Sequence, residues 1–112
     1  MLAKGNRIKK KKDFETIFKK GLGYKSNLLI LKIIKSSFNT NRFGFVVSQK
    51  VSKKSVLRNK VRRRLAEVVR LESDHIKPGI DVVLIALPGI EKKNFSEIKI
   101  SLMGLFKKAE II

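Results

Sequence analysis

The chain has 112 residues, of which 27 are Lys or Arg and nine are Asp or Glu, giving a net charge of +18 at pH 7. The length fits one domain, residues 1–112, and a hydrophobic fraction of 43% is typical of a folded protein. The sequence has no cysteine, which excludes disulfides and thiolate metal sites. A charge this large indicates a polyanionic partner, either nucleic acid or an anionic membrane surface.

The ends of the chain and its hydropathy indicate the cellular location. No apolar run approaches the roughly 20 residues of a membrane span. Residues 1–12 carry six cations and lack the apolar region of a signal peptide, so we expect a basic N-terminal tail on a cytoplasmic protein. His75, the only histidine, lies in a polar connector, where a solvated loop residue is the simplest interpretation.

The first predicted element is a short helix. Asp13 is placed to cap a helix that begins at Phe14 and stops at Gly21. Phe14, Ile17 and Phe18 share one face of this helix. Packing of that face against a sheet is the favoured interpretation, and stacking of an unpaired base on an exposed ring is the alternative.

Two predicted strands follow the helix, Leu28–Lys35 and Arg42–Ser48. We expect them to pair as an antiparallel hairpin, with a short extra strand around residues 23–25. Gly44 faces opposite to Phe43 and Phe45 in the second strand. A glycine in this position indicates a bulge or the close approach of another group to the backbone.

A basic helix is predicted from Ser55, its N-cap, to about Glu72. Between Lys53 and Arg64 there are seven cations and no acid, so neighbouring charges on this helix repel one another unless a polyanion is bound. A merely solvated basic face is the alternative, although solvated faces usually mix both signs.

The other faces of this helix follow from its periodicity. An apolar stripe, which would anchor the helix to a core, is formed by Leu57, Val61, Leu65 and Val68. At about 100° per residue, the residues opposite the stripe are Asn59, Arg63, Ala66 and Arg70. Glu67 is within helical reach of Arg63 or Arg64.

The last third of the chain completes the fold. Ile80–Leu87, interrupted only by Asp81, indicates a buried strand, and since a helix joins it to the strand from Arg42, these two strands should be parallel. Asn94 and Glu97 form a capping box for a final helix. The predicted fold class is a small α+β sandwich, one sheet with helices packed on it, in the order α-β-β-α-β-α.

The chain has the residues of a binding protein and lacks those of a catalyst. Its nine carboxylates are scattered, and no glycine motif for phosphate is present. Arginine forks match phosphate oxygens, and with seven Phe, one Tyr and no Trp, shape and backbone recognition of structured RNA should outweigh stacking. The candidate RNA-binding residues are Lys50, Lys53, Lys54, Arg58, Asn59, Lys60, Arg62, Arg63 and Arg70.

The basic helix and its flanks resemble the signature of the bacterial ribonuclease P protein subunit. In that family the helix begins Arg-Asn and has a basic pair at the fifth and sixth motif positions, and the corresponding residues here are Arg58, Asn59, Arg62 and Arg63. The run from Phe43 to Val51 resembles the family's preceding strand and loop. The segments beginning at Asp13 and at Asp81 also fall where the family has them, so the resemblance covers nearly the whole chain.

The resemblance implies a subunit of a ribonucleoprotein endonuclease whose catalyst is a large RNA carrying Mg²⁺, with neither a cofactor nor a catalytic residue on the protein. It implies that the Arg-Asn helix and the adjoining loop bind this RNA. A cleft between the first helix and the sheet would hold the single-stranded 5′ leader of precursor tRNA, which the holoenzyme removes. The fold would resemble ribosomal protein S5 domain 2, with a left-handed β-α-β crossover. The implied leader-binding residues are Phe14, Phe18, Lys32 and Ser48.

Two positions depart from the family's pattern. Ala66 stands where the family commonly has an arginine, and Arg70, one turn further on, is expected to substitute for it. Leu31 or Lys32 stands where the family often has an aromatic residue that faces the leader.

Two other functional classes fit the sequence. A non-enzymatic ribosome-associated or RNA-chaperone protein would use the same basic surface and would co-purify with ribosomal RNA. A membrane-surface protein would use the basic helix, but the apolar face of this helix lacks the bulky Trp or Phe that such helices favour.

Overall fold

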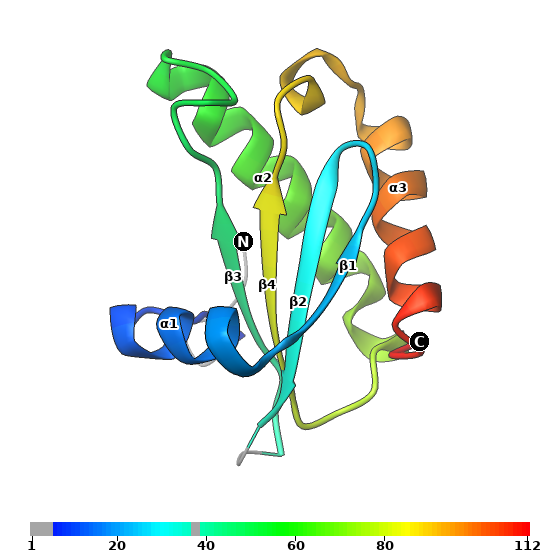
Figure 1. Cartoon of the computed structure of the whole chain (residues 1–112). Coiled ribbons are helices and arrows are strands. Elements are labelled where there is room, and N and C mark those ends of the chain that lie inside the picture. Colours follow the sequence, from blue (N-terminus) through cyan, green and yellow to red (C-terminus); the bar gives the residue numbers. More distant parts are fainter. Residues whose placement is uncertain (1–5, 37–38) are drawn as a thin grey trace.

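A four-stranded mixed sheet forms the centre of the molecule, with one helix on one face and two on the other (Figure 1). The computed structural model describes residues 6–36 and 39–112. The predicted α+β class, the element order and the short extra strand are confirmed. The elements are α1 (Lys11–Lys20), β1 (Leu22–Lys25), β2 (Leu29–Lys35), β3 (Arg42–Val46), α2 (Ser55–Glu72), β4 (Ile80–Ala86) and α3 (Phe95–Lys108), with 3₁₀ turns η2 (Ser73–His75) and η3 (Ile90–Lys92).

The strands lie in the order β1-β2-β4-β3, so the predicted hairpin of β2 with β3 is wrong. β4 lies between them, antiparallel to β2 and parallel to β3, and the parallel pairing was predicted correctly. The physical reason is burial. Val82, Val83 and Leu84 in β4 are all fully buried, and a strand that is apolar on both sides is most stable in the middle of a sheet.

The connection from β3 through α2 to β4 is left-handed, as the resemblance implies. In Figure 1 both strands point upward, α2 lies behind the sheet, and the chain moves from β3 to β4 on its right. Parallel crossovers are right-handed in the great majority of proteins, so strand and helix order alone would have predicted the opposite hand.

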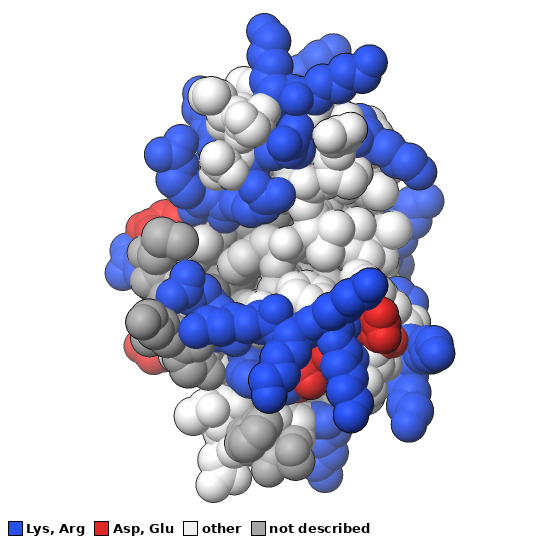
Figure 2. Space-filling view, turned by 90° about the vertical axis from the view of Figure 1, so that its left-hand side faces the viewer, with Lys and Arg blue, Asp and Glu red and all other residues white. Residues whose placement is uncertain are grey.

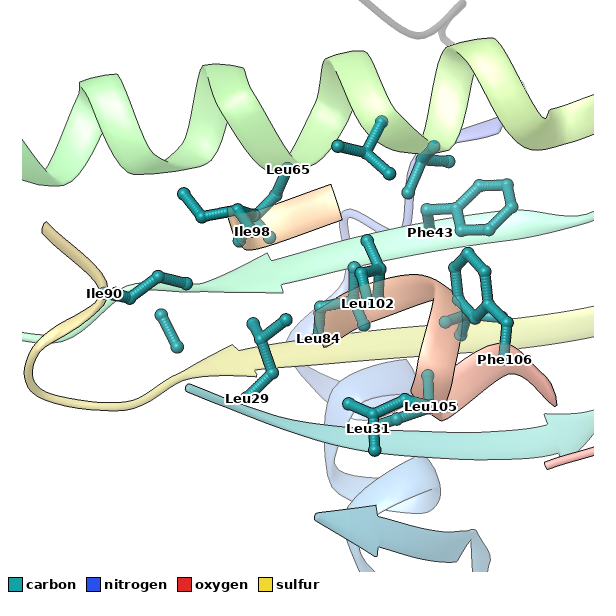
Figure 3. Packing of buried hydrophobic residues seen from close by; sticks show 14 of the residues in the cluster. Leu29, Leu31, Phe43, Leu65, Leu84, Ile90, Ile98, Leu102, Leu105 and Phe106 are labelled. Carbon is teal, nitrogen blue, oxygen red and sulfur yellow. The ribbon is translucent and has the colours of Figure 1, made fainter. Parts of the chain in front are cut away.

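The main core lies between the sheet and the pair α2 and α3 (Figure 3). The apolar stripe of α2 is confirmed, because Val61, Leu65 and Val68 are at most 1% exposed. α3 contributes Ile98, Leu102 and Phe106. Its capping box is also confirmed, with the Asn94 side chain accepting the Glu97 N–H at 2.9 Å.

A smaller cluster lies on the opposite face of the sheet, under α1. Its buried members are Ile8, Ile17 and Val83, and partly buried apolar side chains pack around them, namely Phe14, Ile34, Val46 and Ile85. α1 has one buried residue, Ile17, whereas α2 has five. The helix on this face is therefore held by far less apolar contact than α2.

Both predicted N-caps of the first two helices are wrong. Lys10 and Lys54 occupy the N-cap positions of α1 and α2, and neither makes a side-chain capping bond. Asp13 instead lies within the first turn of α1, where it forms an ion pair with Arg42, 29 residues away. The long-range partner outweighs the local capping preference.

Part of the predicted basic N-terminal tail, from Arg7 to Lys12, is attached to the fold. Residues 1–5 lie outside the described residues, but Arg7 forms a parallel bridge with Phe43, and the Ile8 N–H donates to the Phe43 carbonyl at 2.8 Å. Ile8 is buried, and α1 already begins at Lys11. None of the helices in the described residues is long and apolar enough to cross a membrane.

Candidate RNA interface

The loop after β3 and the first half of α2 present a group of eight cations, which we call the α2 cationic surface. In Figure 2 Lys and Arg side chains gather at the upper end of the molecule, where Figure 1 places the loop after β3 and the start of α2. None of the eight forms an ion pair with an acid in residues 6–36 or 39–112. The members are Lys50, Lys53, Lys54, Arg58, Lys60, Arg62, Arg63 and Arg64.

Three of these arginines brace neighbouring backbone without losing their charge. Arg58 Nη1 donates to the carbonyls of Ser52 and Lys53, both at 3.0 Å, which fixes the loop ahead of α2. Arg62 donates from Nη1 to Asn59 Oδ1 at 2.7 Å and from Nη2 to the carbonyl of Val47, the residue after β3, at 3.2 Å.

Arg64 has the same role toward the segment before α3, since its Nη1 donates to the carbonyl of Lys93 at 2.7 Å. A carbonyl accepts a hydrogen bond without neutralising the guanidinium, and each fork keeps further N–H donors. The cations are thus positioned before any ligand arrives. Sequence reasoning missed this bracing because a backbone acceptor leaves no residue-specific signal.

A hollow of about 420 Å³ lies on the outer side of α2, lined by Val56, Asn59, Arg62 and Arg63. Val56 is 71% exposed, although it is apolar and lies on a helix with five buried residues. Two guanidinium groups beside an apolar side chain suit a phosphate with its attached sugar or base.

The outward face of α2 is narrower than predicted. Ala66 was expected to point outward, but it is only 8% exposed, because the buried side of α2 also includes Val69. The predicted pairing of Glu67 with Arg63 or Arg64 is also wrong. Glu67 instead forms a two-point ion pair with Arg70, at 2.5 and 3.1 Å.

This pair distinguishes Arg70 from the other candidate RNA-binding residues. Its hydrogen bonds lower the pKa of Glu67 and raise the pKa of Arg70, so both groups stay charged at neutral pH. Arg70 was expected to substitute for the arginine that the family commonly has where this chain has Ala66. Arg70 therefore already has an acidic partner, Glu67.

The α1 face of the sheet brings together three of the four predicted leader-binding residues. Phe14 is half-buried and lies over Gly44, where an added Cβ would stand 2.6 Å from the ring. This explains the glycine as a site of close approach. Phe18 is 40% exposed, with its ring centroid 6.3 Å from that of Phe14. Ile17 between them is 1% exposed, so the core interpretation is confirmed for Ile17, whereas the ring of Phe18 is open to solvent and stacking of a base on it stays a prediction.

Lys32 lies on the same face of the sheet, since its neighbour in β4 is the buried Val83 of the α1 cluster. Its side chain extends over Gly23 of β1. Ser48 lies elsewhere, beyond the end of β3, where its hydroxyl accepts the N–H of Lys50 at 3.3 Å. It belongs structurally to the loop of the α2 cationic surface.

Figure 2 shows how these regions are arranged on one side of the molecule. A band without charged side chains separates the upper cationic group from a lower group of Lys and Arg side chains at the level of α1. An uncharged strip between two positive borders suits a nucleic-acid strand whose bases lie on the strip and whose phosphates face the borders.

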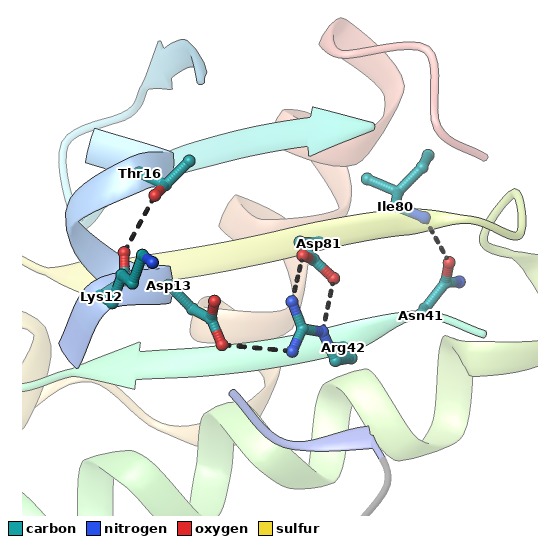
Figure 4. A network of polar contacts seen from close by, with 7 residues as sticks. All are labelled: Lys12, Asp13, Thr16, Asn41, Arg42, Ile80 and Asp81. Atoms are coloured by element: carbon teal, nitrogen blue, oxygen red, sulfur yellow. Dashed lines mark hydrogen bonds and ion pairs between the residues drawn. The ribbon is translucent and has the colours of Figure 1, made fainter. Parts of the chain in front are cut away.

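A polar network fixes α1 to the sheet (Figure 4). The Arg42 fork donates to both carboxylate oxygens of Asp81, at 3.0 and 2.7 Å, and to Asp13 at 3.3 Å. These hydrogen bonds, chiefly that to Asp81, raise the pKa of Arg42. In the described residues no group of three or more His, Cys, Asp or Glu side chains is placed to hold a metal ion.

These features define a class: a small basic α+β protein of the RNA-binding kind, with a braced cationic helix on one face of the sheet and a helix that carries two aromatic side chains on the other. Comparison with known proteins gives the family. The Ribonuclease P family model matches residues 2–110. The chain belongs to the ribonuclease P protein family.

Individual relatives cover nearly the full chain. The ribonuclease P protein component of Clostridium botulinum (strain 657) is 42% identical over 109 residues, which is 96% of this chain and 97% of that protein. That of Alkaliphilus oremlandii is 37% identical over 107 residues, 96% of this chain and 93% of the relative.

Solved structures agree with the fold. The RNase P protein of Staphylococcus aureus superposes with a TM-score of 0.88 at 30% identity, covering 95% of this chain and 96% of that one. The RNase P protein of Thermotoga maritima gives a TM-score of 0.83 at 27% identity, covering 91% and 96%.

Proposed function

We propose that this chain is the protein subunit of ribonuclease P in the cytoplasm and assists removal of the 5′ leader from precursor tRNA. The catalytic RNA would bind the α2 cationic surface, and the single-stranded leader would bind between α1 and the sheet. The observation that carries the proposal is the set of eight cations that no acid of the described residues neutralises, in a chain that belongs to this family.

The α2 cationic surface supports the first contact. Arg58, Arg62 and Arg64 are held by backbone carbonyls, so their orientation is fixed before binding and less conformational entropy is lost when phosphates arrive. A helix face of this kind reads the path of a backbone and is suited to a folded RNA.

The α1 face supports the second contact. Phe18 offers an exposed ring for stacking, and Lys32 offers a charge on the same side of the sheet. A flexible single strand can adapt to such a strip, whereas a rigid duplex cannot bring its bases onto it.

The proposal places the Mg²⁺ ions on the catalytic RNA. The carboxylates of the described residues do not fit a protein site, because they form no cluster of three or more metal-ligating side chains. Asp13 and Asp81 are already engaged by Arg42. On this proposal the protein contributes binding and orientation and leaves the chemistry to the RNA.

Cleavage of precursor tRNA at low Mg²⁺ by the cognate catalytic RNA, with and without the protein, tests the proposal. We expect strong stimulation by the protein. The double variant Arg62→Ala/Arg63→Ala should lose most of this stimulation, whereas Lys107→Ala/Lys108→Ala, which removes the same charge from the end of α3, should retain it. Absence of stimulation by the wild-type protein, together with recovery of ribosomal RNA from cells, would favour a ribosome-associated protein instead.

A further inference from the structure

Asp13 is the one residue of α1 that joins the network around Arg42 (Figure 4). Arg42 and Asp81 face each other on neighbouring parallel strands, and both oxygens of Asp81 are occupied by the Arg42 fork. Asp81 has a side chain only 8% exposed, so it requires Arg42 as a counter-ion. Asp13 is 32% exposed and provides a second, outer contact to the same guanidinium.

This outer contact has a cost on an RNA-binding surface. A carboxylate in the first turn of α1 repels the phosphates that the surrounding lysines attract. The buried Asp81–Arg42 pair is already hydrogen-bonded at two points without it. Asp13 therefore repels the expected ligand, and the Asp81–Arg42 pair does not need it. These two facts make Asp13 a candidate for a positioning role.

The geometry shows what Asp13 positions. It precedes Phe14, and the two residues contact alternate positions of the same strand, with Asp13 on Arg42 and Phe14 over Gly44. Together these contacts attach the first turn of α1 to β3. Ile17 is the only buried residue of α1, so few other contacts hold the first turn of this helix in its place above the sheet.

We propose that Asp13 is a positioning residue that, through Arg42, sets the placement of α1 at which a single RNA strand binds between Phe18 and the sheet. This inference depends on the proposed function, because it concerns the leader-binding face. It assigns to an acidic side chain a favourable effect on RNA binding, which is opposite in sign to its direct electrostatic effect.

Two variants with the same charge change separate the two effects. Asp13→Asn and Glu15→Gln each remove one negative charge from α1, and Glu15 is exposed and makes no ion pair with any of the described residues. Each variant is assembled with the cognate catalytic RNA, and the holoenzyme's Kd is measured for precursor tRNA and for the same tRNA without its leader.

Electrostatics alone predicts slightly tighter binding of both RNAs by both variants. We expect this result for Glu15→Gln only. Asp13→Asn should weaken binding of the precursor about threefold and leave binding of the leaderless tRNA unchanged, since a partly exposed ion pair has an effect of this order. Urea unfolding of both variants should show that the fold is retained, which excludes a general loss of structure.

The inference is overturned if Asp13→Asn tightens precursor binding as Glu15→Gln does, or if it weakens binding of both RNAs equally. Failure of the proposed function gives a different result, in which the wild-type holoenzyme itself does not distinguish precursor from leaderless tRNA. A further variant, Asp13→Glu, restores the carboxylate one methylene further out, and recovery of part of the leader-dependent affinity supports positioning by the ion pair.

Discussion

α1, whose cations are all lysines, and α2, whose cations are mostly arginines, lie on opposite faces of one sheet and are attached to it in different ways. α2 has five buried residues, and its arginines brace three stretches of backbone. α1 has one buried residue, one ion pair to the sheet and an exposed aromatic ring. The two helices have a similar net charge per residue. They differ in how firmly they are attached to the sheet and in the apolar side chains that they expose.

The difference teaches that net charge alone does not define an RNA site. A braced row of guanidinium groups is suited to a partner that is itself folded, because both surfaces keep their shapes. A lightly anchored helix beside an uncharged strip is suited to a strand that has no fixed shape. The following variants test whether the two helices really divide the work in this way.

The largest expected effect is on the α2 side. Arg58→Ala and Arg62→Ala should each weaken binding of the catalytic RNA about tenfold, because each would remove the proposed charge-assisted contact to phosphate and also removes a hydrogen bond that holds the loop before α2. Lys9→Ala, an exposed cation ahead of α1, should weaken it less than about twofold. Filter binding at a fixed salt concentration measures all three. Equal losses would show that only total charge matters and would remove the distinction between the helices.

The next effect concerns the contact between α1 and β3, where Phe14 packs over Gly44. Gly44→Ala places a methyl group 2.6 Å from the Phe14 ring, so the ring must move, and we expect a loss of about 1–3 kcal/mol in unfolding free energy. Precursor binding should fall while catalytic-RNA binding is kept. The matched control is Gly104→Ala in α3, where nothing lies within 4 Å of the added Cβ, and a gain of about 0.5–1 kcal/mol is expected. Urea unfolding would contradict this account if both variants shifted stability in the same direction.

A smaller effect is expected for the exposed ring itself. Phe18→Ala should leave the unfolding free energy nearly unchanged, since the side chain is 40% exposed, and should weaken precursor binding about threefold through lost stacking. Ile100→Ala removes another exposed apolar side chain, 74% exposed, from α3 and should change neither quantity. Competition between precursor and leaderless tRNA measures the difference. An unchanged competition ratio for Phe18→Ala would exclude stacking on this ring.

The smallest effect is expected at the far end of α2. Glu67→Gln releases Arg70 from its ion pair and should tighten catalytic-RNA binding by less than about twofold. The pKa of Glu67 is lowered below its ordinary 4.5 by Arg70, so the pair's stabilising contribution is present above that value and is lost as the pH falls through the lowered pKa. Binding titrations of wild type and variant should therefore differ at neutral pH and converge in acid. A difference that persists in acid would mean that Arg70 is not the group released.

Much of this fold could be predicted because its signals are local. The stripe on α2, the capping box of α3 and the buried run of β4 each depend on a few neighbouring residues, and all three are present. The position of β4 between β2 and β3 depends on which strands share the most buried surface, and a strand's own sequence does not specify its neighbours. Two strands close in sequence therefore looked like a hairpin.

The errors at single residues have the same origin. Asp13 is a residue type that often caps helices, but its partner Arg42 is distant in sequence. Their ion pair follows from the packing of α1 against β3, which the local sequence does not specify. Ala66 lies one position from Leu65 in the stripe, and neighbouring elements cover a methyl group that a wheel of ideal 100° steps places outside. The candidate cations could be named because residue type gives the charge. The backbone carbonyls that orient them could not be predicted, because every residue has one.

The short parallel bridge between Arg7 and Phe43 has a consequence for the behaviour of the protein in solution. An unpaired outer strand invites hydrogen bonding to another copy of the chain, which is a common route to aggregation. Here the segment that includes Ile8 occupies part of the outer side of β3 and takes up one of its carbonyls. The N-terminal segment thus shields part of the outer strand of the sheet from pairing with a second copy of the chain.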